Sequence, residues 1–168
     1  PESISYIKEK LDGKHLSQEK IKQIVNDIFA NNLSQIELTY FVAGCYSHGL
    51  DLDETAALTR AIGDTGNKLR LGKKIILDKH CIGGVANNRT SMIIVPIIAA
   101  AGLIIPKTSS RAITSAAGTA DAMEALANVS LPLNKIEKVV RKTNGCIIWG
   151  GTMDLASADD KLIKVEYP

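Results

Sequence analysis

The chain has 168 residues, of which 45% are apolar and 23% are charged. This is the usage of an ordinary globular protein, and it excludes a disordered segment, a collagen and a small disulfide-stabilised scaffold. The net charge is only +2 and aromatic residues make up 4%, so we expect no nucleic-acid partner.

The first two predicted elements are short amphipathic helices. Apolar residues recur at helical spacing over residues 4–11, and Gly13 follows as a stop signal. The same spacing runs from Ile21 to Phe29, and Ser17 precedes it as an N-cap candidate. The pattern therefore predicts two consecutive helices.

Capping patterns mark the next two helices. Ser34 and Glu37 have the spacing of a capping box, and the helix that they open ends near Gly49. Asp51 opens a fourth helix that runs to about Ile62. Because the connections are short, these helices are expected to pack as antiparallel neighbours. Their apolar faces most simply form their own core, and a surface for a partner helix is the alternative.

We therefore assign residues 1–66 to an all-α helical domain. Residues 67–74 contain four basic side chains and Gly72, and they are predicted to be a linker. The basic run could contact phosphate, but a solvated loop is the simpler interpretation.

The second half of the chain alternates between short apolar runs and helical patterns. Strands are predicted at 75–77, 103–105 and 146–149, and helices at 89–101, 119–127 and 134–145. This alternation is typical of a parallel sheet with helical crossovers. We predict the fold class α/β, with a small all-α domain followed by the first part of an α/β domain.

Three loops follow the predicted strands, at 78–85, 108–115 and 150–154. In parallel sheets, ligands bind beyond the carboxyl ends of the strands. The first loop combines Lys79 with two adjacent glycines, which allow backbone N–H groups to approach an anion closely. The second loop is rich in hydroxyl groups and contains Arg111. Together they indicate a phosphate site.

Each of these features also has a simpler explanation. The glycine pair could form a plain turn, His80 could be a hydrogen-bonded polar residue, and Cys81 could be a buried thiol. The hydroxyl groups could merely cap helices. From spacing alone, phosphate binding and a set of ordinary turns are equally supported, and a nucleophilic Cys81–His80 pair is disfavoured.

At this point the motifs resemble a known family. The run Asp78-Lys79-His80-Cys81-Ile82-Gly83-Gly84-Val85 resembles the signature of thymidine and pyrimidine-nucleoside phosphorylases. The segment from Lys107 to Glu124 is more similar to the archaeal-type AMP (nucleoside 5′-monophosphate) phosphorylases. The resemblance implies a helical domain joined to an α/β domain, with the active site in a cleft between them. It implies reversible phosphorolysis of an N-glycosidic bond, with inorganic phosphate as co-substrate and no metal or cofactor.

The resemblance also assigns residues by position. It implies that His80 assists at the sugar and base as a hydrogen-bonding helper. The phosphate- and nucleotide-binding residues that it implies are Lys79, Cys81, Gly83, Gly84, Ser91, Ser109, Ser110, Arg111, Ala112, Ile113, Thr114, Ser115 and Thr119.

Some positions depart from the family pattern. Cys81 stands where thymidine phosphorylases have a serine ligand, and a thiol is a weak donor. Tyr167 stands near the place of a base-reading arginine, which favours a monophosphate substrate over thymidine. Family members are much longer, and the group that protonates the leaving base would follow Pro168. We therefore expect a fragment, with a partial α/β phosphate-binding domain over 75–150 and a segment over 151–168 that returns towards the helical domain.

Three alternatives remain open: a thymidine phosphorylase, an enzyme similar to anthranilate phosphoribosyltransferase, and a non-catalytic dimerisation module. The second shares the run from Gly118 to Leu126 but not the first signature, and it would need Mg²⁺. Family resemblance implies a homodimer through the helical domain.

The cysteines and the apolar runs bear on location. The three cysteines, Cys45, Cys81 and Cys146, have neither disulfide-framework nor zinc-site spacing, which favours a reduced, cytoplasmic location. No signal peptide is expected, and the apolar run over 92–101 is too short to span a membrane.

Overall fold

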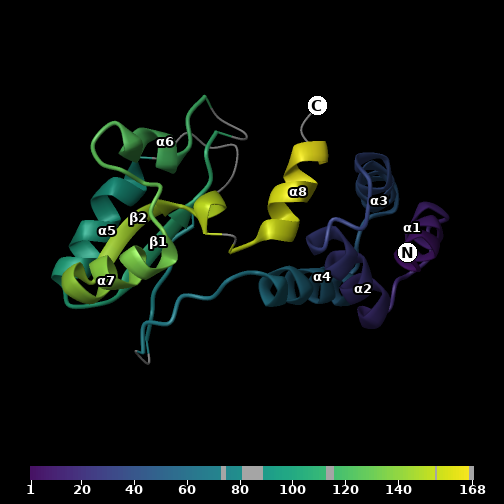
Figure 1. Cartoon of the computed structure of the whole chain (residues 1–168), viewed down its shortest axis with the longest axis horizontal. Coiled ribbons are helices and arrows are strands. Elements are labelled where there is room, and N and C mark those ends of the chain that lie inside the picture. Colours follow the sequence, from purple (N-terminus) through teal and green to yellow (C-terminus); the bar gives the residue numbers. More distant parts are fainter. Residues whose placement is uncertain (73–74, 81–88, 113–115, 154, 167–168) are drawn as a thin grey trace. The chain divides into compact units, whose positions relative to one another are not determined.

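The computed structural model describes residues 1–72, 75–80, 89–112, 116–153 and 155–166 (Figure 1). The chain forms two compact units, one made of residues 1–67 and 155–168 and the other of residues 68–154. The first unit is helical and the second contains a parallel sheet, so the predicted fold class is confirmed.

The helical unit contains five of the described helices. They are α1 (Ser3–Leu11), α2 (Gln18–Phe29), α3 (Gln35–His48), α4 (Leu52–Thr65) and α8 (Ser157–Glu166). The capping predictions are confirmed at Ser34 and Asp51, each of which forms a capping box with the glutamate three residues later. Ser17 caps α2 by accepting a bond from the Lys20 N–H. These helix starts are local, because a cap needs only residues within one turn.

Two features of this unit differ from the sequence prediction. Helix α4 continues past Ile62 to Thr65, because Gly63 keeps a helical conformation. Helix α8 was not predicted. Its buried residues, Ala158 and Leu162, are one turn apart and complete the core of α1–α4. That contact depends on packing rather than on local pattern.

The core of the helical unit is dense and apolar. Its largest fully buried side chains are Leu16, Ile21, Ile24, Val25 and Ile28. Helix α8 is also tied to this core at its polar side, where Lys161 Nζ donates to the carbonyls of Ile28 and Phe29 at 3.0 and 2.7 Å. These carbonyls belong to the last turn of α2, where helices leave acceptors unsatisfied.

One ion pair is buried in this core. Lys10 Nζ lies 2.9 Å from both carboxylate oxygens of Glu54, and each side chain is only 3% exposed. Glu54 also accepts bonds from the N–H groups of Leu16 and Asp51. Burial by itself would raise the pKa of Glu54, but the Lys10 ammonium and these amides outweigh it and hold that pKa below its usual range. The pair therefore joins α1 to α4 as a fully bonded group.

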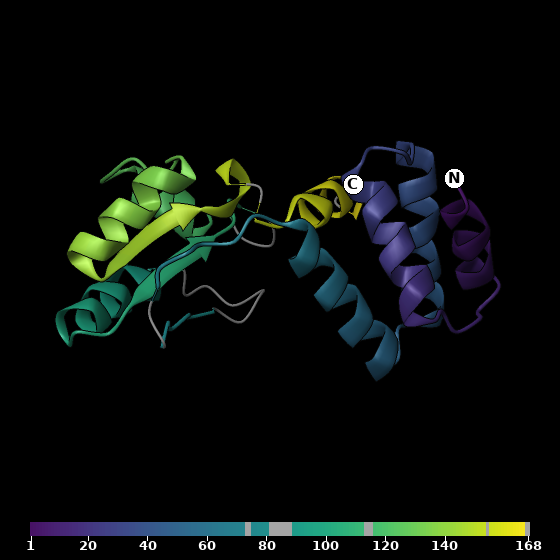
Figure 2. The same cartoon turned by 60° about the horizontal axis from the view of Figure 1, so that its bottom comes forward.

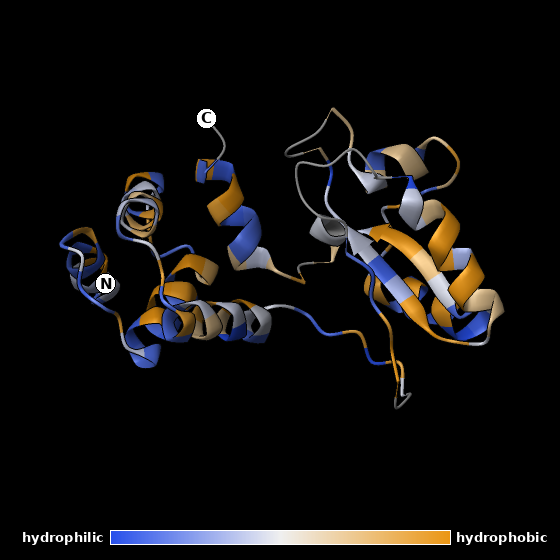
Figure 3. Ribbon diagram, turned by 180° about the vertical axis from the view of Figure 1, so that it is seen from behind, coloured by the Kyte–Doolittle hydropathy of each residue, from blue (hydrophilic) through white to orange (hydrophobic). Residues whose placement is uncertain are grey.

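The second unit has helices packed along two strands that run side by side (Figure 2). Its elements are α5 (Thr90–Ala100), β1 (Ile105–Ser109), α6 (Thr119–Glu124), α7 (Leu133–Thr143), β2 (Gly145–Trp149) and the short 3₁₀ helix η1 (Gly150–Thr152). Strands β1 and β2 are parallel, with Ile105 opposite Gly145 and Ser109 opposite Trp149. Helix α5 is apolar along most of its length (Figure 3).

The predicted strand at 103–105 was placed too early, since β1 begins at Ile105 and extends to Ser109. Gly102 has a φ of +83° and ends the turn after α5. Ile105 donates its N–H towards β2, to the Asn144 carbonyl, so the missing N–H of Pro106 faces the opposite side. The proline therefore does not interrupt the β1–β2 ladder.

The strand predicted at 75–77 is present only as one parallel bridge between Ile76 and Ile104. The Leu77 N–H donates to the Ile104 carbonyl at 2.7 Å. Because carbonyls alternate sides along a strand, this segment lies on the side of β1 opposite β2. All three segments run in the same direction, so their carboxyl ends lie at one edge.

Helix α7 also differs from its prediction, since it begins at Leu133 and ends at Thr143, with Asn144 as its C-cap. Asn144 adopts the left-handed conformation, with φ of 62°, one residue before the glycine expected to end the helix. The core of this unit is built from Ile104, Ile105, Val129, Ile136, Val140 and Ile148. Among the described residues of either unit, no helix has both the length and the apolar character that a membrane span requires.

Candidate functional site

The predicted site residues that the structure describes lie at the carboxyl edge of the α/β unit. Lys79 and His80 follow the bridge at Ile76, and Ser109 and Ser110 stand at the end of β1. Cys81, Gly83, Gly84, Ile113, Thr114 and Ser115 lie outside the described residues. Ligands of parallel sheets bind at this edge, so the topology places these residues where a site is expected.

Lys79 and Ser91 are brought together from opposite sides of the first loop. Lys79 Nζ donates to Ser91 Oγ at 3.1 Å, although the two residues are twelve positions apart. Ser91 is fully buried in the first turn of α5, and the Lys79 N–H is held by the Asp78 carboxylate at 2.8 Å. An ammonium next to a hydroxyl donor suits a phosphate oxygen. His80 is exposed in the same segment.

At the end of β1, Ser109 is half-buried and Ser110 is exposed. The Ser109 hydroxyl donates to the carbonyl of Ser110 at 3.0 Å. Lys107 lies on the same face of the strand as Ser109, because side chains two residues apart share a face. Lys107 is buried, and its ammonium contacts the Thr108 carbonyl. Sequence analysis did not single out this lysine, although a charge inside an apolar strand was a signal.

Thr119, another predicted ligand, is buried at the start of α6. The residue before it, Gly118, approaches the chain at Ser110 and Arg111 very closely. A Cβ atom on Gly118 would lie 2.6 Å from the Ser110 carbonyl oxygen and 2.7 Å from the Arg111 carbonyl carbon. Only glycine fits here, and its role is close approach, since its φ is an ordinary −81°.

Arg111 is surrounded by carboxylates. Its guanidinium donates to Glu124 through both terminal nitrogens, at 2.6 and 2.9 Å, and to Asp121 at 2.9 Å. It also stacks over the Trp149 ring, with Cζ 4.5 Å from the centroid. Sequence analysis predicted that Arg111 contacts the nucleotide and did not recognise Asp121, Glu124 or Trp149 as its neighbours.

The pKa values in this cluster shift as its contacts require. The Gly118 amide, and then the Arg111 guanidinium, hold the pKa of Asp121 below its usual range. The Arg111 guanidinium also lowers the pKa of Glu124, and the two carboxylates together raise the pKa of Arg111. All three groups are therefore charged at neutral pH.

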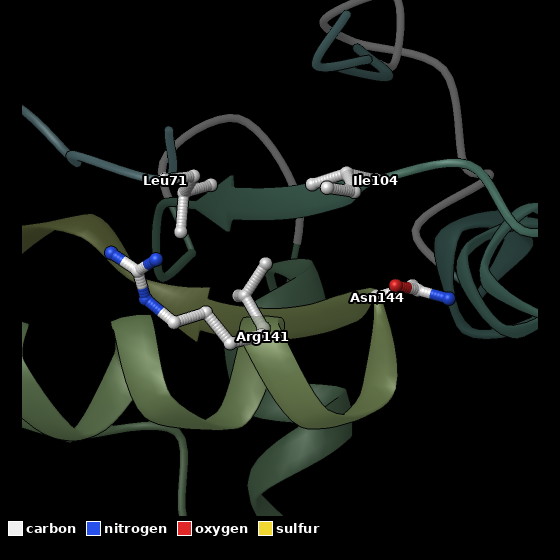
Figure 4. A pocket seen from close by; sticks show the side chains of 5 residues that line it. Leu71, Ile104, Arg141 and Asn144 are labelled. Carbon is white, nitrogen blue, oxygen red and sulfur yellow. The ribbon is translucent and has the colours of Figure 1, made fainter. Parts of the chain in front are cut away.

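A small cavity lies elsewhere in this unit. It has a volume of about 120 Å³ and is lined by Leu71, Ile104, Val140, Arg141 and Asn144 (Figure 4). Arg141 donates to the Arg70 carbonyl and Glu137 accepts from the Arg70 N–H, both at 2.8 Å, which fixes the segment beside the cavity to α7. Pockets for small-molecule ligands usually enclose roughly 300–1,000 Å³. None of the predicted site residues lines this cavity, so it is not a nucleotide site.

In the helical unit, His15, Asp51 and Glu54 lie close enough together to resemble metal ligands. Their contacts have another explanation. Asp51 caps α4 and bonds to the His15 ring at 2.7 Å, and Glu54 pairs with Lys10. The cluster is therefore accounted for by helix capping and by the buried ion pair.

Comparison with known proteins shows the relationship. Residues 4–66 match the model of the glycosyl transferase family helical bundle domain, and residues 73–165 match that of the family's α/β domain. The chain is 51% identical over 168 residues to AMP phosphorylase 1 of Archaeoglobus fulgidus, covering all of this chain and 33% of that protein. It is 52% identical over 166 residues to AMP phosphorylase of Thermococcus kodakarensis, covering 99% of this chain and 33% of that protein. A protein from a Polaromonas species named putative thymidine phosphorylase is 49% identical over 167 residues, which cover 99% of this chain and 33% of that protein.

The fold is also found in a solved structure. Anthranilate phosphoribosyltransferase from Thermus thermophilus matches 95% of this chain and 49% of its own, with a TM-score of 0.79 and 22% identity. At this identity the likeness concerns the fold alone. The curated relatives are about three times as long as this chain, which spans 33% of each. Since both domain models match over nearly the whole chain, it belongs to the glycosyl transferase family that combines a helical bundle with an α/β domain.

Proposed function

We propose that the complete protein is a nucleoside 5′-monophosphate phosphorylase, with AMP as the representative substrate. It would transfer the 5-phosphoribosyl group from the base to inorganic phosphate, giving free base and ribose 1,5-bisphosphate. The observation that carries this proposal is the Lys79–Ser91 contact at the carboxyl edge of the sheet, in a chain about half identical to AMP phosphorylases. The chain itself would supply the phosphate half of the site.

In this proposal, two groups of residues meet the phosphate. Lys79 and Ser91 provide an ammonium and a buried hydroxyl from the first loop and α5. Ser109, Ser110 and Thr119 provide hydroxyl groups from β1 and α6. Neutral donors with one or two cations bind a phosphate oxygen without neutralising its nucleophilicity completely, which suits an attacking dianion.

The reaction requires that phosphate be positioned next to the sugar, and it needs no covalent intermediate with the protein. Phosphate oxygen forms a bond to the anomeric carbon as the bond to the base nitrogen breaks, and the leaving base takes up a proton. Holding the dianion next to the developing positive charge of the sugar stabilises the transition state electrostatically. His80, exposed beside Lys79, would assist at the sugar and base. Cys81, Gly83, Gly84 and Ile113–Ser115 remain predicted ligands.

The test is base release from AMP, CMP, UMP and thymidine by the complete protein, with and without inorganic phosphate. We expect phosphate-dependent release from the monophosphates that persists in EDTA. Release from thymidine alone would indicate a nucleoside phosphorylase, and a requirement for Mg²⁺ with diphosphate would indicate a phosphoribosyltransferase. Either result would overturn the proposal.

Two variants test the phosphate residues. Lys79→Gln and Ser91→Ala are expected to raise the KM for phosphate by roughly tenfold or more, because each removes a donor to a charged ligand. Lys135→Gln is the matched control, since Lys135 is an exposed lysine on α7 outside the site. A phosphate KM unchanged in both site variants would show that the anion binds elsewhere.

The 168-residue chain alone is expected to bind phosphate with little or no turnover, because the group that protonates the base would lie outside it. Isothermal titration with phosphate and a base-release assay on the same sample separate the two properties. Phosphate-dependent release by the isolated chain would contradict this expectation.

We also propose that the helical domain, residues 1–66, forms a homodimer. Ile36 and Tyr40 are exposed one turn apart on α3, 67% and 53% respectively. A second copy would cover this apolar face. Light scattering should give twice the monomer mass, and Tyr40→Asp should shift it towards the monomer. A monomer at high concentration would contradict the proposal.

We further propose a cytoplasmic location. The unpaired thiols of Cys45 and Cys146 fit this location.

A further inference from the structure

We propose that Arg111 is a positioning residue that fixes the loop between Ser110 and Gly118, and that it does not bind the anionic substrate itself. Its partners are Asp121, Glu124 and Trp149, which together we call the Arg111 cluster. The inference rests on the proposed function only in taking this loop as a substrate loop.

The Arg111 guanidinium is already bound to two carboxylates. Both terminal nitrogens bind Glu124 in a two-point contact, and one of them also reaches Asp121. With one cation and two carboxylates, the cluster has a local charge of −1. A phosphate dianion approaching Arg111 would have to displace these carboxylates or be repelled by them. Arginine paired in this way is a poor anion ligand.

The Arg111 guanidinium also contacts the end of the sheet. It stacks over Trp149, with Cζ 4.5 Å from the ring centroid. Trp149 is the last residue of β2 and lies opposite Ser109 in the parallel register. A planar guanidinium over an indole adds attraction and fixes orientation. Arg111 is therefore held between the strand end and α6.

The second carboxylate oxygen of Asp121 joins two segments of the backbone. Asp121 Oδ2 accepts the backbone N–H of Ala112 and that of Gly118, both at 2.8 Å. One carboxylate oxygen thus holds two points of the chain that are six residues apart. Gly118 also approaches the Ser110 and Arg111 backbone too closely for any side chain. The two arms of the loop are therefore joined at their base.

These contacts link the cluster to the predicted phosphate hydroxyls. Ser110 precedes Arg111, and Thr119 follows Gly118, so the joined arms set the positions of both residues. Arg111 neutralises Asp121 while that carboxylate binds the two amides, and Glu124 keeps the guanidinium in place. Removing any member is expected to move the hydroxyl donors by a fraction of an ångström, and such displacements cost binding and rate.

The two roles of Arg111 make opposite predictions for Glu124→Gln in the complete protein. If Arg111 positions the loop, Glu124→Gln loosens it and raises the KM for phosphate on the order of tenfold, as Arg111→Gln does. If Arg111 binds the substrate anion, Glu124→Gln frees the guanidinium and removes a repelling charge, so the phosphate KM stays the same or falls. An unchanged or lowered phosphate KM in Glu124→Gln would therefore overturn the inference.

Arg111→Lys separates the roles a second time. Lysine keeps the charge but has neither the two-point fork nor the planar stack. We expect it to behave like Arg111→Gln, whereas partial rescue of phosphate binding would indicate an anion ligand. The double variant Arg111→Gln with Glu124→Gln should be no worse than the poorer single variant, because both break the same network. Arg60→Gln, at an exposed arginine of α4, controls for loss of a positive charge.

Hydrogen exchange gives a readout that needs no activity. Peptides spanning residues 108–120 should exchange at least tenfold faster in Arg111→Gln and Glu124→Gln than in the wild type or in Arg60→Gln, because the guanidinium no longer holds Asp121, the acceptor of the Ala112 and Gly118 amides, in place. Unchanged exchange would overturn the inference. If the wild-type protein releases no base at all, the proposed function fails, and the exchange result still decides the role of Arg111.

Discussion

The two units use the same kind of ion pair for different purposes. In the helical unit, Lys10 and Glu54 are buried between α1 and α4 and serve the core. In the α/β unit, Arg111 with Asp121 and Glu124 is part-exposed at the carboxyl end of the strands and holds a loop. The two pairs show that the place of a charge pair decides what it holds: inside a closed core it joins two helices, and at a strand edge it holds the backbone of a loop.

The units also differ in how their cores are assembled, although both leave some large apolar side chains exposed. In the helical unit the apolar stripes of α1, α2 and α4 meet in one core with α8. In the α/β unit the described sheet has two five-residue strands, and Ile93 and Ile97 of α5 stay largely exposed. We therefore expect the helical unit to be the more stable of the two.

The largest expected effect comes from removing half of the buried ion pair. Lys10→Met leaves the Glu54 carboxylate buried without its cation and should lower the free energy of unfolding of the helical unit by about 3–5 kcal/mol. Lys8→Met, on the exposed side of the same helix, is the control and should change it by less than about 0.5 kcal/mol. Chemical denaturation followed by far-UV circular dichroism measures both. A loss below about 1 kcal/mol in Lys10→Met would show that the pair does not support this core.

The next largest effect is the loss of stability when a core side chain is shortened in either unit. Ile24→Ala and Ile105→Ala each empty a fully buried site and should cost about 2–5 kcal/mol in their own unit. The chain has a single tryptophan, Trp149, and it lies in the α/β unit. Tryptophan emission should therefore report Ile105→Ala and not Ile24→Ala, while circular dichroism reports both. If both variants shift the tryptophan transition equally, the units unfold as one.

A smaller effect concerns acid. The folded-state pKa values of Asp121 and Glu124 are lowered, so the stability that they contribute is present above their ordinary values and is lost as pH falls through the lowered ones. Trp149 emission should stay constant down to about pH 4 and change below it. In Arg111→Gln the change should move to higher pH, because the carboxylates lose their cation. If the acid transition lies at the same pH in Arg111→Gln as in the wild type, Trp149 emission does not report the ionisation of Asp121 and Glu124.

The smallest effect concerns two partly buried thiols, Cys45 and Cys146, and leaves stability unchanged. Burial raises the pKa of Cys45 to about 11 and that of Cys146 to about 12. At pH 7.5 both should react with iodoacetamide on the order of a hundred-fold more slowly than a free thiol, because the thiolate is the nucleophile. Mass spectrometry after timed labelling measures each site, and urea-unfolded protein is the control. Faster labelling of Cys146 than of Cys45 would support a less stable α/β unit, and rapid labelling of Cys45 would contradict the comparison.

Features of the fold were predictable from the sequence where both partners lie within one helical turn, or where strands and helices alternate along the chain. The capping boxes of Ser34 and Asp51 were predicted because both partners lie within three residues. The alternation of the second half predicted a parallel sheet, because a parallel pair needs a crossover between its strands. A phosphate site at the carboxyl edge of the sheet stays a prediction, and the structure brings Lys79 and Ser91 together at that edge.

Tertiary structure decided the rest. Lys10 has the sequence surroundings of a solvent-exposed lysine, and it is buried because packing brings Glu54 to it from 44 residues away. Helix α8 was not predicted, and it is held by a core assembled from the other end of the chain. Arg111 in a hydroxyl-rich loop suggests an anion ligand, but its neighbours come from α6 and β2. The amino-acid sequence by itself determined where the capped helices begin and that the sheet is parallel, since the caps depend on neighbouring residues and the strand direction on the alternation of elements. Only packing determined which charges meet, because their partners are distant in the chain.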